Sequence, residues 1–162
     1  MIIREMTPED WPEVRLIYKA GVDAGKSTFQ TEIPTWEAWN ASHREICRIV
    51  AEVDGKVAGW AALSPTSSRA CYAGVNEVSV YVAPEAKGKG VGTTLLREIV
   101  ERSEAAGVWQ LYGSVFDTNE ASLRMCEKAG VRRVGYREAI AINKDGAWQN
   151  TVIVERRSPK IW

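Results

Sequence analysis

The sequence predicts an α/β fold in which helices flank a mixed, largely antiparallel sheet. Three observations carry this prediction: strand-like and helix-like segments alternate, two hairpin signals join neighbouring strands, and a glycine-rich turn leads from a valine-rich strand into a helix. The chain has 162 residues, of which 45% are hydrophobic and 26% are charged. That length and composition are typical of one compact unit, so we expect a single domain over residues 1–162.

The N-terminal segments predict one strand and two helices. Residues 2–5 form a short apolar strand, and Thr7 followed by Pro8 is a typical helix start. The helix that follows has an apolar face at helical spacing, formed by Trp11, Val14, Ile17 and Tyr18. After a polar loop over residues 27–34, Thr35 is expected to cap a second helix that contains Trp36, Trp39 and Ile46.

The middle of the chain predicts three strands. Segments 48–53 and 56–63 are strand-like, and Asp54-Gly55 between them is a strong hairpin signal. Segment 76–82 alternates, so its two sets of side chains are expected on opposite faces of the sheet. One set is Val78, Val80 and Val82, and the other is Glu77, Ser79 and Tyr81.

The C-terminal half predicts two helices and three strands. The first helix follows the glycine-rich turn and has an inner face formed by Leu95, Leu96, Ile99 and Ser103. The remaining elements are strand 109–116, helix 120–129 and the hairpin strands 134–142 and 148–156. Asn119 is the expected cap of the second helix, and Lys144-Asp145-Gly146 is the expected hairpin turn.

Composition excludes several functional classes. The 21 basic and 21 acidic residues cancel, which argues against a broad nucleic-acid surface. The single histidine, His43, and three scattered cysteines do not suggest a metal site, a Ser-His-Asp triad or a disulfide framework. We expect His43 to be an exposed helix residue. No apolar run is long enough for a bilayer and no signal peptide is visible, so we expect a cytoplasmic protein with no membrane partner.

The glycine-rich turn is the most informative motif. Gly88, Gly90 and Gly92 lie between the alternating strand and the next helix, with Lys87 and Lys89 among them. Free main-chain amides at a helix N-terminus bind anions, and glycine lets a ligand approach the backbone closely. The motif therefore predicts a pyrophosphate cradle; a plain strand–helix turn is the alternative. The glycine spacing fits neither a Walker loop nor a dinucleotide fingerprint.

Segment 80–92 resembles the acetyl-CoA motif of the GNAT N-acetyltransferases, whose core is Gln/Arg-x-x-Gly-x-Gly/Ala. Lys87 takes the Gln/Arg position. Asn119-Glu120-Ala121-Ser122, leading to Glu127-Lys128-Ala129-Gly130, resembles the second signature. Further segments resemble the phosphinothricin and methionine sulfoximine acetyltransferase branch: Ile17-Tyr18, Ser27-Thr28-Phe29, residues 31–36, Ser64-Pro65, residues 69–72, residues 77–82 and Lys144-x-Gly146-x-Trp148.

The resemblance implies a GNAT-type fold and acetyl-CoA as cosubstrate. The pantetheine arm would lie along the backbone of Val80, Tyr81 and Val82. The pyrophosphate would lie on the turn formed by Lys87, Gly88, Lys89, Gly90, Val91, Gly92 and Thr93. Asn119 and Ser122 would contact the same molecule, and Asn119 has the alternative role of a helix cap alone.

The expected chemistry is attack by an amine on the thioester. An ammonium group cannot attack, so a base must take its proton, and the resemblance makes Glu77 that base. A main-chain N–H near Val82 would stabilise the oxyanion. Cys126 stands where many GNAT enzymes have tyrosine and this branch commonly has histidine, and Val78 stands where the branch has another histidine. Cys126 is therefore either a general acid for the leaving thiolate or a small buried hydrophobe.

The expected acceptor is the α-amine of a small amino acid or analogue, of the methionine sulfoximine, methionine sulfone or phosphinothricin type. Its binding residues would be Phe29, Arg69, Tyr72, Gly74 and Val75, with Arg69 as the carboxylate clamp. Trp36, Trp39 and Trp109 are expected in the core, whereas Trp60 and Trp148 fit either the core or the site. The alternatives are a different amine, such as a polyamine, an aminoglycoside or a protein N-terminus, and a non-catalytic acyl-CoA-binding module. The branch implies a homodimer.

Overall fold

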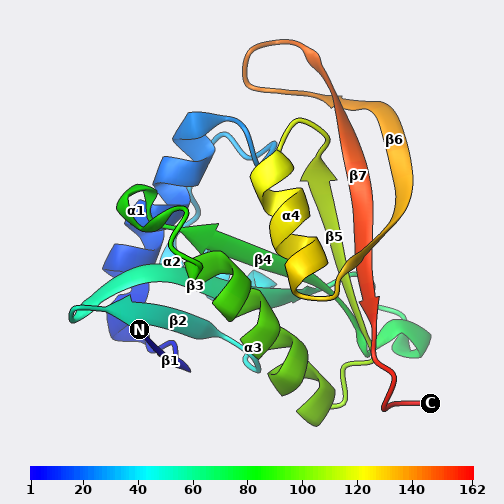
Figure 1. Cartoon of the computed structure of the whole chain (residues 1–162), viewed down its shortest axis with the longest axis horizontal. Coiled ribbons are helices and arrows are strands. Elements are labelled where there is room, and N and C mark those ends of the chain that lie inside the picture. The colour runs from blue at the N-terminus through cyan, green and yellow to red at the C-terminus, as the bar shows by residue number, and fades with distance from the viewer.

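The computed structural model describes residues 1–162, which fold into one α/β unit (Figure 1). The strands are β1 (Ile2–Glu5), β2 (Ile49–Val53), β3 (Lys56–Pro65), β4 (Val75–Val82), β5 (Gln110–Phe116), β6 (Arg132–Ile142) and β7 (Trp148–Arg157). The helices are α1 (Trp11–Ala24), α2 (Trp36–Ser42), α3 (Val91–Ala105) and α4 (Glu120–Lys128). Three short 3-10 turns are η1 (Pro8–Asp10), η2 (Ala70–Tyr72) and η3 (Pro84–Ala86).

The seven strands form one sheet in the order β1-β2-β3-β4-β5-β7-β6. Only β4 and β5 run parallel; every other pair is antiparallel. The expected mixed, largely antiparallel sheet is confirmed, as is the order of the main strands and helices. None of the helices is both long and apolar enough to cross a membrane.

Helices cover both faces of the sheet, and β4 shows how. The ring of Tyr81 lies against that of Tyr18 from α1, with 4.8 Å between centroids. Its neighbour Val82 points the other way, toward Gly92 in α3. Because successive strand residues face opposite sides, α1 and α3 lie on opposite faces of the sheet.

The sheet opens in its middle. The β4–β5 ladder consists of three residue pairs and ends where Glu77 lies opposite Tyr112. Beyond that point β4 pairs only with β3, while β5 continues along β7. One edge of β4 from Val78 to Val82 therefore has no strand beside it, and this gap shapes the candidate site.

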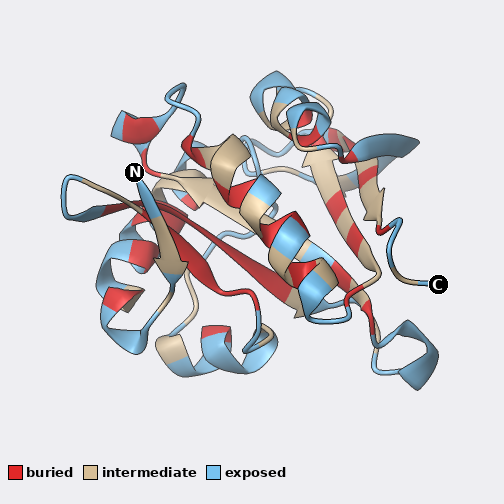
Figure 2. Ribbon diagram, turned by 60° about the horizontal axis from the view of Figure 1, so that its bottom comes forward, coloured by how far each residue is buried: buried red, intermediate tan, exposed pale blue.

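Two apolar clusters hold the fold together (Figure 2). The larger contains 23 buried residues, mainly from α1, α2, α3, β2 and β3, with Trp39 and Trp60 among its fully buried side chains. The smaller packs α4 against β7 and α3 through Leu96, Leu123, Cys126, Val131, Val152 and Val154. Trp60 is thus a core residue, whereas Trp148 is 68% exposed at the start of β7.

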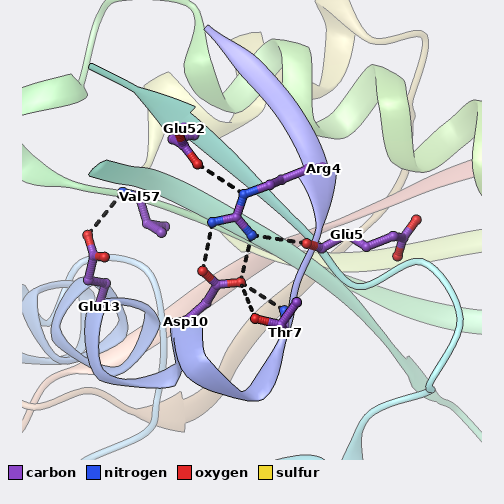
Figure 3. A network of polar contacts seen from close by, with 7 residues as sticks. All are labelled: Arg4, Glu5, Thr7, Asp10, Glu13, Glu52 and Val57. Carbon is purple, nitrogen blue, oxygen red and sulfur yellow. Dashed lines mark hydrogen bonds and ion pairs between the residues drawn. The ribbon is translucent and has the colours of Figure 1, made fainter. Parts of the chain in front are cut away.

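A polar network joins β1 to the beginning of the first helical region (Figure 3). Arg4 donates two 2.8 Å hydrogen bonds to the carboxylate of Asp10 and a third, of 3.0 Å, to Glu52 on β2. Glu13 of α1 accepts a 3.0 Å bond from the main-chain N–H of Val57 on β3. These contacts fix the edge strand and α1 to the β2–β3 hairpin.

Two predicted elements differ from the structure. The expected helix containing Ile46 ends at Ser42, because His43 adopts extended dihedral angles, and Ile46 lies beyond the helix with 38% exposure. Strand β6 begins at Arg132, two residues earlier than expected, and its register shifts between Arg137 and Ala141. Ala139 in that shift has a φ of +47°, and its N–H donates a 2.8 Å hydrogen bond to Asn150 Oδ1.

Candidate active site

A cavity of about 980 Å³ lies at the gap between β4 and β5. Its walls come from the loop after α1, the end of α2, strands β4 and β5, and helix α4. It contains the predicted site residues Phe29, Glu77, Val80, Tyr81, Asn119, Ser122 and Cys126. The separation of the two strands therefore creates a space that reaches from the middle of β4 to the start of α4.

Glu77 is the acidic residue of this cavity on β4. Its side chain keeps contact with solvent, yet the surrounding cavity walls raise the pKa of its carboxyl above the usual range by desolvation. The nearby positive charge of Arg137 opposes that rise. A carboxylate in this setting is a better proton acceptor than an ordinary surface glutamate.

The open edge of β4 fits an extended ligand. Val80 and Tyr81 line the cavity, and the Tyr81 ring stacks on Trp60 with centroids 4.9 Å apart. Burial raises the pKa of Tyr81, so its phenol stays neutral. The side chains are thus fixed by the core while the strand's main-chain groups on the β5 side remain free to bind.

The glycine-rich turn meets the requirements of an anion cradle. Gly88 and Gly90 have φ values of +75° and +83°, with open space where a side chain would begin. A Cβ on Gly92 would lie 2.8 Å from the sulfur of Met125 on α4, so only glycine fits that position without a shift. No main-chain hydrogen bond is donated by the amides of Gly88, Gly90, Val91, Gly92 and Thr93. Five free amides at a helix N-terminus suit a pyrophosphate.

Charged side chains also lie beside this turn. Lys87 and Lys89 are exposed and form no ion pair with the protein. They add positive charge beside the free amides, which favours an anion. The residues present therefore fit the diphosphate of coenzyme A.

Asn119 caps helix α4, as expected. Its Oδ1 accepts a 3.1 Å hydrogen bond from the main-chain N–H of Ser122. Both residues line the cavity as well, so the cap leaves room for a second role. Contact with a cosubstrate stays a prediction for both.

Cys126 is buried on the inner face of α4 and also lines the cavity. Burial raises the pKa of its thiol to about 11, with a further contribution from Glu127. The thiol is therefore protonated at neutral pH. A leaving thiolate with a pKa near 8.5 would accept its proton only at a cost of roughly 3 kcal/mol. Cys126 is placed where it can contact a ligand in the cavity, but the free-energy cost of this proton transfer favours a packing role for its side chain.

Four predicted substrate-binding residues lie outside the cavity. The guanidinium of Arg69 lies 5.4 Å from the ring centre of Tyr72, and both side chains are exposed. Gly74 packs against Trp109, and Val75 begins the parallel ladder. Phe29, in contrast, lines the cavity and packs on Phe116 with 4.7 Å between centroids. The structure does not bring Arg69 together with Glu77 within the cavity.

Sequence reasoning missed two groups of this region, namely a further lining residue of the cavity and the positive charge that acts on Glu77. His43, expected to be exposed on a helix, is half-buried, follows α2 directly and lines the cavity. His43 follows the buried Trp39 by four residues, a spacing that places two side chains on the same face of a helix, and this was the available signal. Arg137 of β6 is placed on the same sheet face as Glu77 by strand register, a relation that only the tertiary structure reveals.

The class of protein follows from these features together with the sequence comparison. Residues 3–131 match the model of the acetyltransferase (GNAT) family. The chain belongs to this family and is an acetyltransferase.

Several of its relatives are phosphinothricin or methionine sulfoximine acetyltransferases. The chain is 32% identical to phosphinothricin N-acetyltransferase from Alcaligenes faecalis over 160 residues, which cover 95% of this chain and 81% of that protein. It is 26% identical to the L-methionine sulfoximine/L-methionine sulfone acetyltransferase from Pseudomonas paraeruginosa, over 94% of this chain and 92% of that one. The solved phosphinothricin acetyltransferase from Sinorhizobium meliloti, in complex with AcCoA, superposes with a TM-score of 0.86 at 26% identity. That match covers 99% of this chain and 95% of the other.

Proposed function

We propose that this acetyltransferase moves the acetyl group of acetyl-CoA to the α-amine of a small amino acid or analogue. Methionine sulfoximine, methionine sulfone and phosphinothricin represent the acceptor type. One observation carries the proposal. The unpaired edge of β4 runs between the five free amides after the strand and Glu77, so one chain segment serves both the donor and the acceptor.

The donor side binds acetyl-CoA, which supplies the thioester whose acetyl group is transferred. The amides from Gly88 to Thr93 hold the pyrophosphate, and Lys87 and Lys89 add charge. The backbone of β4 from Val80 to Val82 binds the pantetheine arm as an additional strand would. Asn119 and Ser122 complete this side at the start of α4.

On the acceptor side, Glu77 prepares the nucleophile. Its carboxylate takes a proton from the ammonium group, directly or through a water molecule, and leaves the electron pair on nitrogen. A main-chain N–H near Val82 donates to the carbonyl oxygen as negative charge develops there. The transfer is direct, within a ternary complex. Cys126 packs beside the site in this scheme and is not required as the acid.

An acceptor panel tests the proposal. The protein is incubated with acetyl-CoA and one amine at a time, and the release of free thiol is measured. Turnover of methionine sulfone, methionine sulfoximine or phosphinothricin, with acetylation at the α-amine, supports the proposal. Binding of acetyl-CoA without turnover of any amine would support a non-catalytic module instead.

One observation favours a second candidate, a cationic amine such as a polyamine. The titratable residues that line the cavity include Glu32 and Glu77 but no lysine or arginine. An acidic cavity attracts a multiply charged amine, whereas an amino acid also needs a cation for its carboxylate. The same panel separates the two candidates through the ratio of kcat/KM for methionine sulfone and for spermidine.

We also propose that the protein forms a homodimer. Five large apolar side chains are exposed on the β6–β7 hairpin: Val134, Tyr136, Ile140, Ile142 and Trp148. Several large exposed apolar side chains on one hairpin are typical of an interface. Light scattering measures the mass in solution. A cytoplasmic location stays a prediction from the sequence.

A further inference from the structure

His43 is the only histidine of the chain, and its ring is held firmly at the end of α2. The imidazole stacks on Trp39 with 4.2 Å between centroids and an interplanar angle of 19°. It also meets the edge of Trp60 at 6.4 Å. The aromatic core therefore fixes the orientation of the ring.

One hydrogen bond sets the tautomer. His43 Nδ1 lies 2.8 Å from the main-chain oxygen of Trp39, and a carbonyl oxygen can only accept. The proton must therefore be on Nδ1, which leaves Nε2 with a free lone pair. The hydroxyl of Ser42 lies 3.1 Å from Nδ1 and donates to the same carbonyl at 3.0 Å.

Nε2 is free of protein partners. It makes no hydrogen bond within the protein, and it is not among the buried polar atoms that lack a partner, so it contacts solvent. The main-chain N–H of Arg44 donates a 2.7 Å bond to Leu63, and the next residue, Ser64, lies opposite Glu77 on β4. His43, Ser64 and Glu77 therefore belong to one stretch of the cavity wall.

Burial keeps the ring of His43 neutral. Burial lowers the pKa of His43, and the positive charge of Arg48 lowers it further, against a smaller rise from the bond to Trp39. Arg48 at the start of β2 donates a 2.7 Å bond to the main-chain oxygen of His43. On the cavity side, the ionisable groups are those of Glu32, Glu77, Tyr18, Tyr81 and Cys126. At neutral pH the lone pair of Nε2 is therefore available.

We propose that His43 is a further catalytic residue, whose Nε2 accepts the second proton that the acceptor nitrogen must lose, after Glu77 has taken the first from the ammonium group. This inference rests on the proposed function. Once the nitrogen has bonded to the acetyl carbon, one N–H bond of this adduct breaks, its electron pair stays on nitrogen, and a new N–H bond forms at Nε2, while the C–S bond breaks and its electron pair leaves with the thiolate. The imidazolium keeps its Nδ1–H bond to Trp39. Solvent takes the proton after each turnover.

NMR spectroscopy tests the proton position directly, because untagged protein gives a single imidazole signal. We expect the Nδ1–H tautomer, titration below the ordinary midpoint of about 6.5, and a change at Nε2 when acceptor and CoA are added together. A proton on Nε2 in the free protein, or an Nε2 signal that does not change when acceptor and CoA are added, would overturn the proposal.

Variants test the catalytic role. His43→Phe keeps a flat ring against Trp39 but has no Nε2, and His43→Gln keeps polarity without basicity. We expect both to lower kcat by roughly a hundredfold while the KM for acetyl-CoA stays unchanged, and to remove the histidine ionisation from the pH profile of kcat/KM. Glu37→Gln, at an exposed position of α2, is the matched control; its kcat and pH profile should equal those of the wild type.

These outcomes separate the two proposals. The variants are assayed with whichever amine the wild type acetylates. Turnover restricted to polyamines contradicts the amino-acid acceptor and still tests His43. A folded His43→Phe variant with wild-type kcat and pH profile overturns the role of His43 and leaves the acceptor assignment standing. A wild type that acetylates no amine contradicts both.

Discussion

Glu77 and Tyr112 form the last residue pair of the parallel ladder between β4 and β5. The proposed base is thus placed at the point where the sheet divides, with paired backbone on one side and the cavity on the other. A conservative change at this position tests its chemistry without removing volume. We expect Glu77→Gln to lower kcat by about 10² to 10⁴ and to leave the KM for acetyl-CoA unchanged. Glu85→Gln on the exposed turn η3 is the control, and equal activity of the two variants contradicts the role of Glu77.

Gly90 provides a test of the anion cradle. Its φ of +83° makes any side chain unfavourable by about 1 kcal/mol, and a Cβ would also narrow the space beside the free amides. We expect Gly90→Ala to weaken acetyl-CoA binding about tenfold, measured by calorimetry, which corresponds to about 1.4 kcal/mol. Gly107→Ala has nearly the same strain, with a φ of +80°, but lies at the other end of α3. It should lose similar stability and bind acetyl-CoA normally.

Arg137 provides a test of the electrostatics around Glu77. Its positive charge favours the ionised carboxylate, so its removal raises the pKa of Glu77 beyond the rise already caused by burial. We therefore expect the acidic limb of kcat/KM to move to higher pH in Arg137→Ala, with activity lost first at low pH. Arg133→Ala, which removes an ion pair with Glu127, is the control and should leave the limb in place. A shift toward lower pH in Arg137→Ala contradicts the assignment.

The pair of Arg4 and Asp10 makes stability depend on pH. The guanidinium of Arg4 holds the pKa of Asp10 below its ordinary value, mainly through hydrogen bonds. A depressed pKa contributes stability above the unfolded value of about 3.9, and that contribution is lost as pH falls through the folded value. We expect Arg4→Ala to cost about 2 kcal/mol at pH 7 and less at pH 3, measured by urea unfolding. Lys19→Ala breaks an exposed pair and should leave the stability nearly unchanged at either pH.

The hairpin patch provides a test of the homodimer. Ile142 is 57% exposed among the other apolar side chains of β6 and β7. We expect Ile142→Asp to convert the dimer to a monomer in light scattering without lowering the Tm of the folded chain, because the side chain is not part of the core. Leu16→Asp on α1 introduces the same charge at a position with 62% exposure and should leave the dimer intact. A dimer that survives both changes must use another surface.

Local sequence signals predicted most of the fold. The turn at Asp54-Gly55, the alternation along β4 and the cap at Asn119 each depend on residues close in sequence, and each appears in the structure. Ile46 was assigned wrongly because apolar spacing continued past His43, where the backbone leaves the helix.

The composition of the cavity depends on long-range relations and was only partly predictable. Resemblance placed Glu77 and Phe29 at the cavity. It did not reveal that Arg69 and Tyr72 lie outside the cavity, because the position of the η2 turn relative to the cavity depends on the tertiary structure. His43 lines the same cavity as Glu77, and the charge of Arg137 acts on Glu77, although these residues are 34 and 60 positions away in sequence, a separation that no local pattern spans.

The short ladder at the centre of the sheet has a mechanical consequence. The three residue pairs between β4 and β5 are the only strand pairing that connects β1 to β4 with β5 to β7. A molecule that hydrogen-bonds along the free edge of β4 and also contacts α4 would hold the two parts of the sheet together. We therefore expect acetyl-CoA to slow amide hydrogen exchange in β5 and β7, strands that lie beyond its direct contacts.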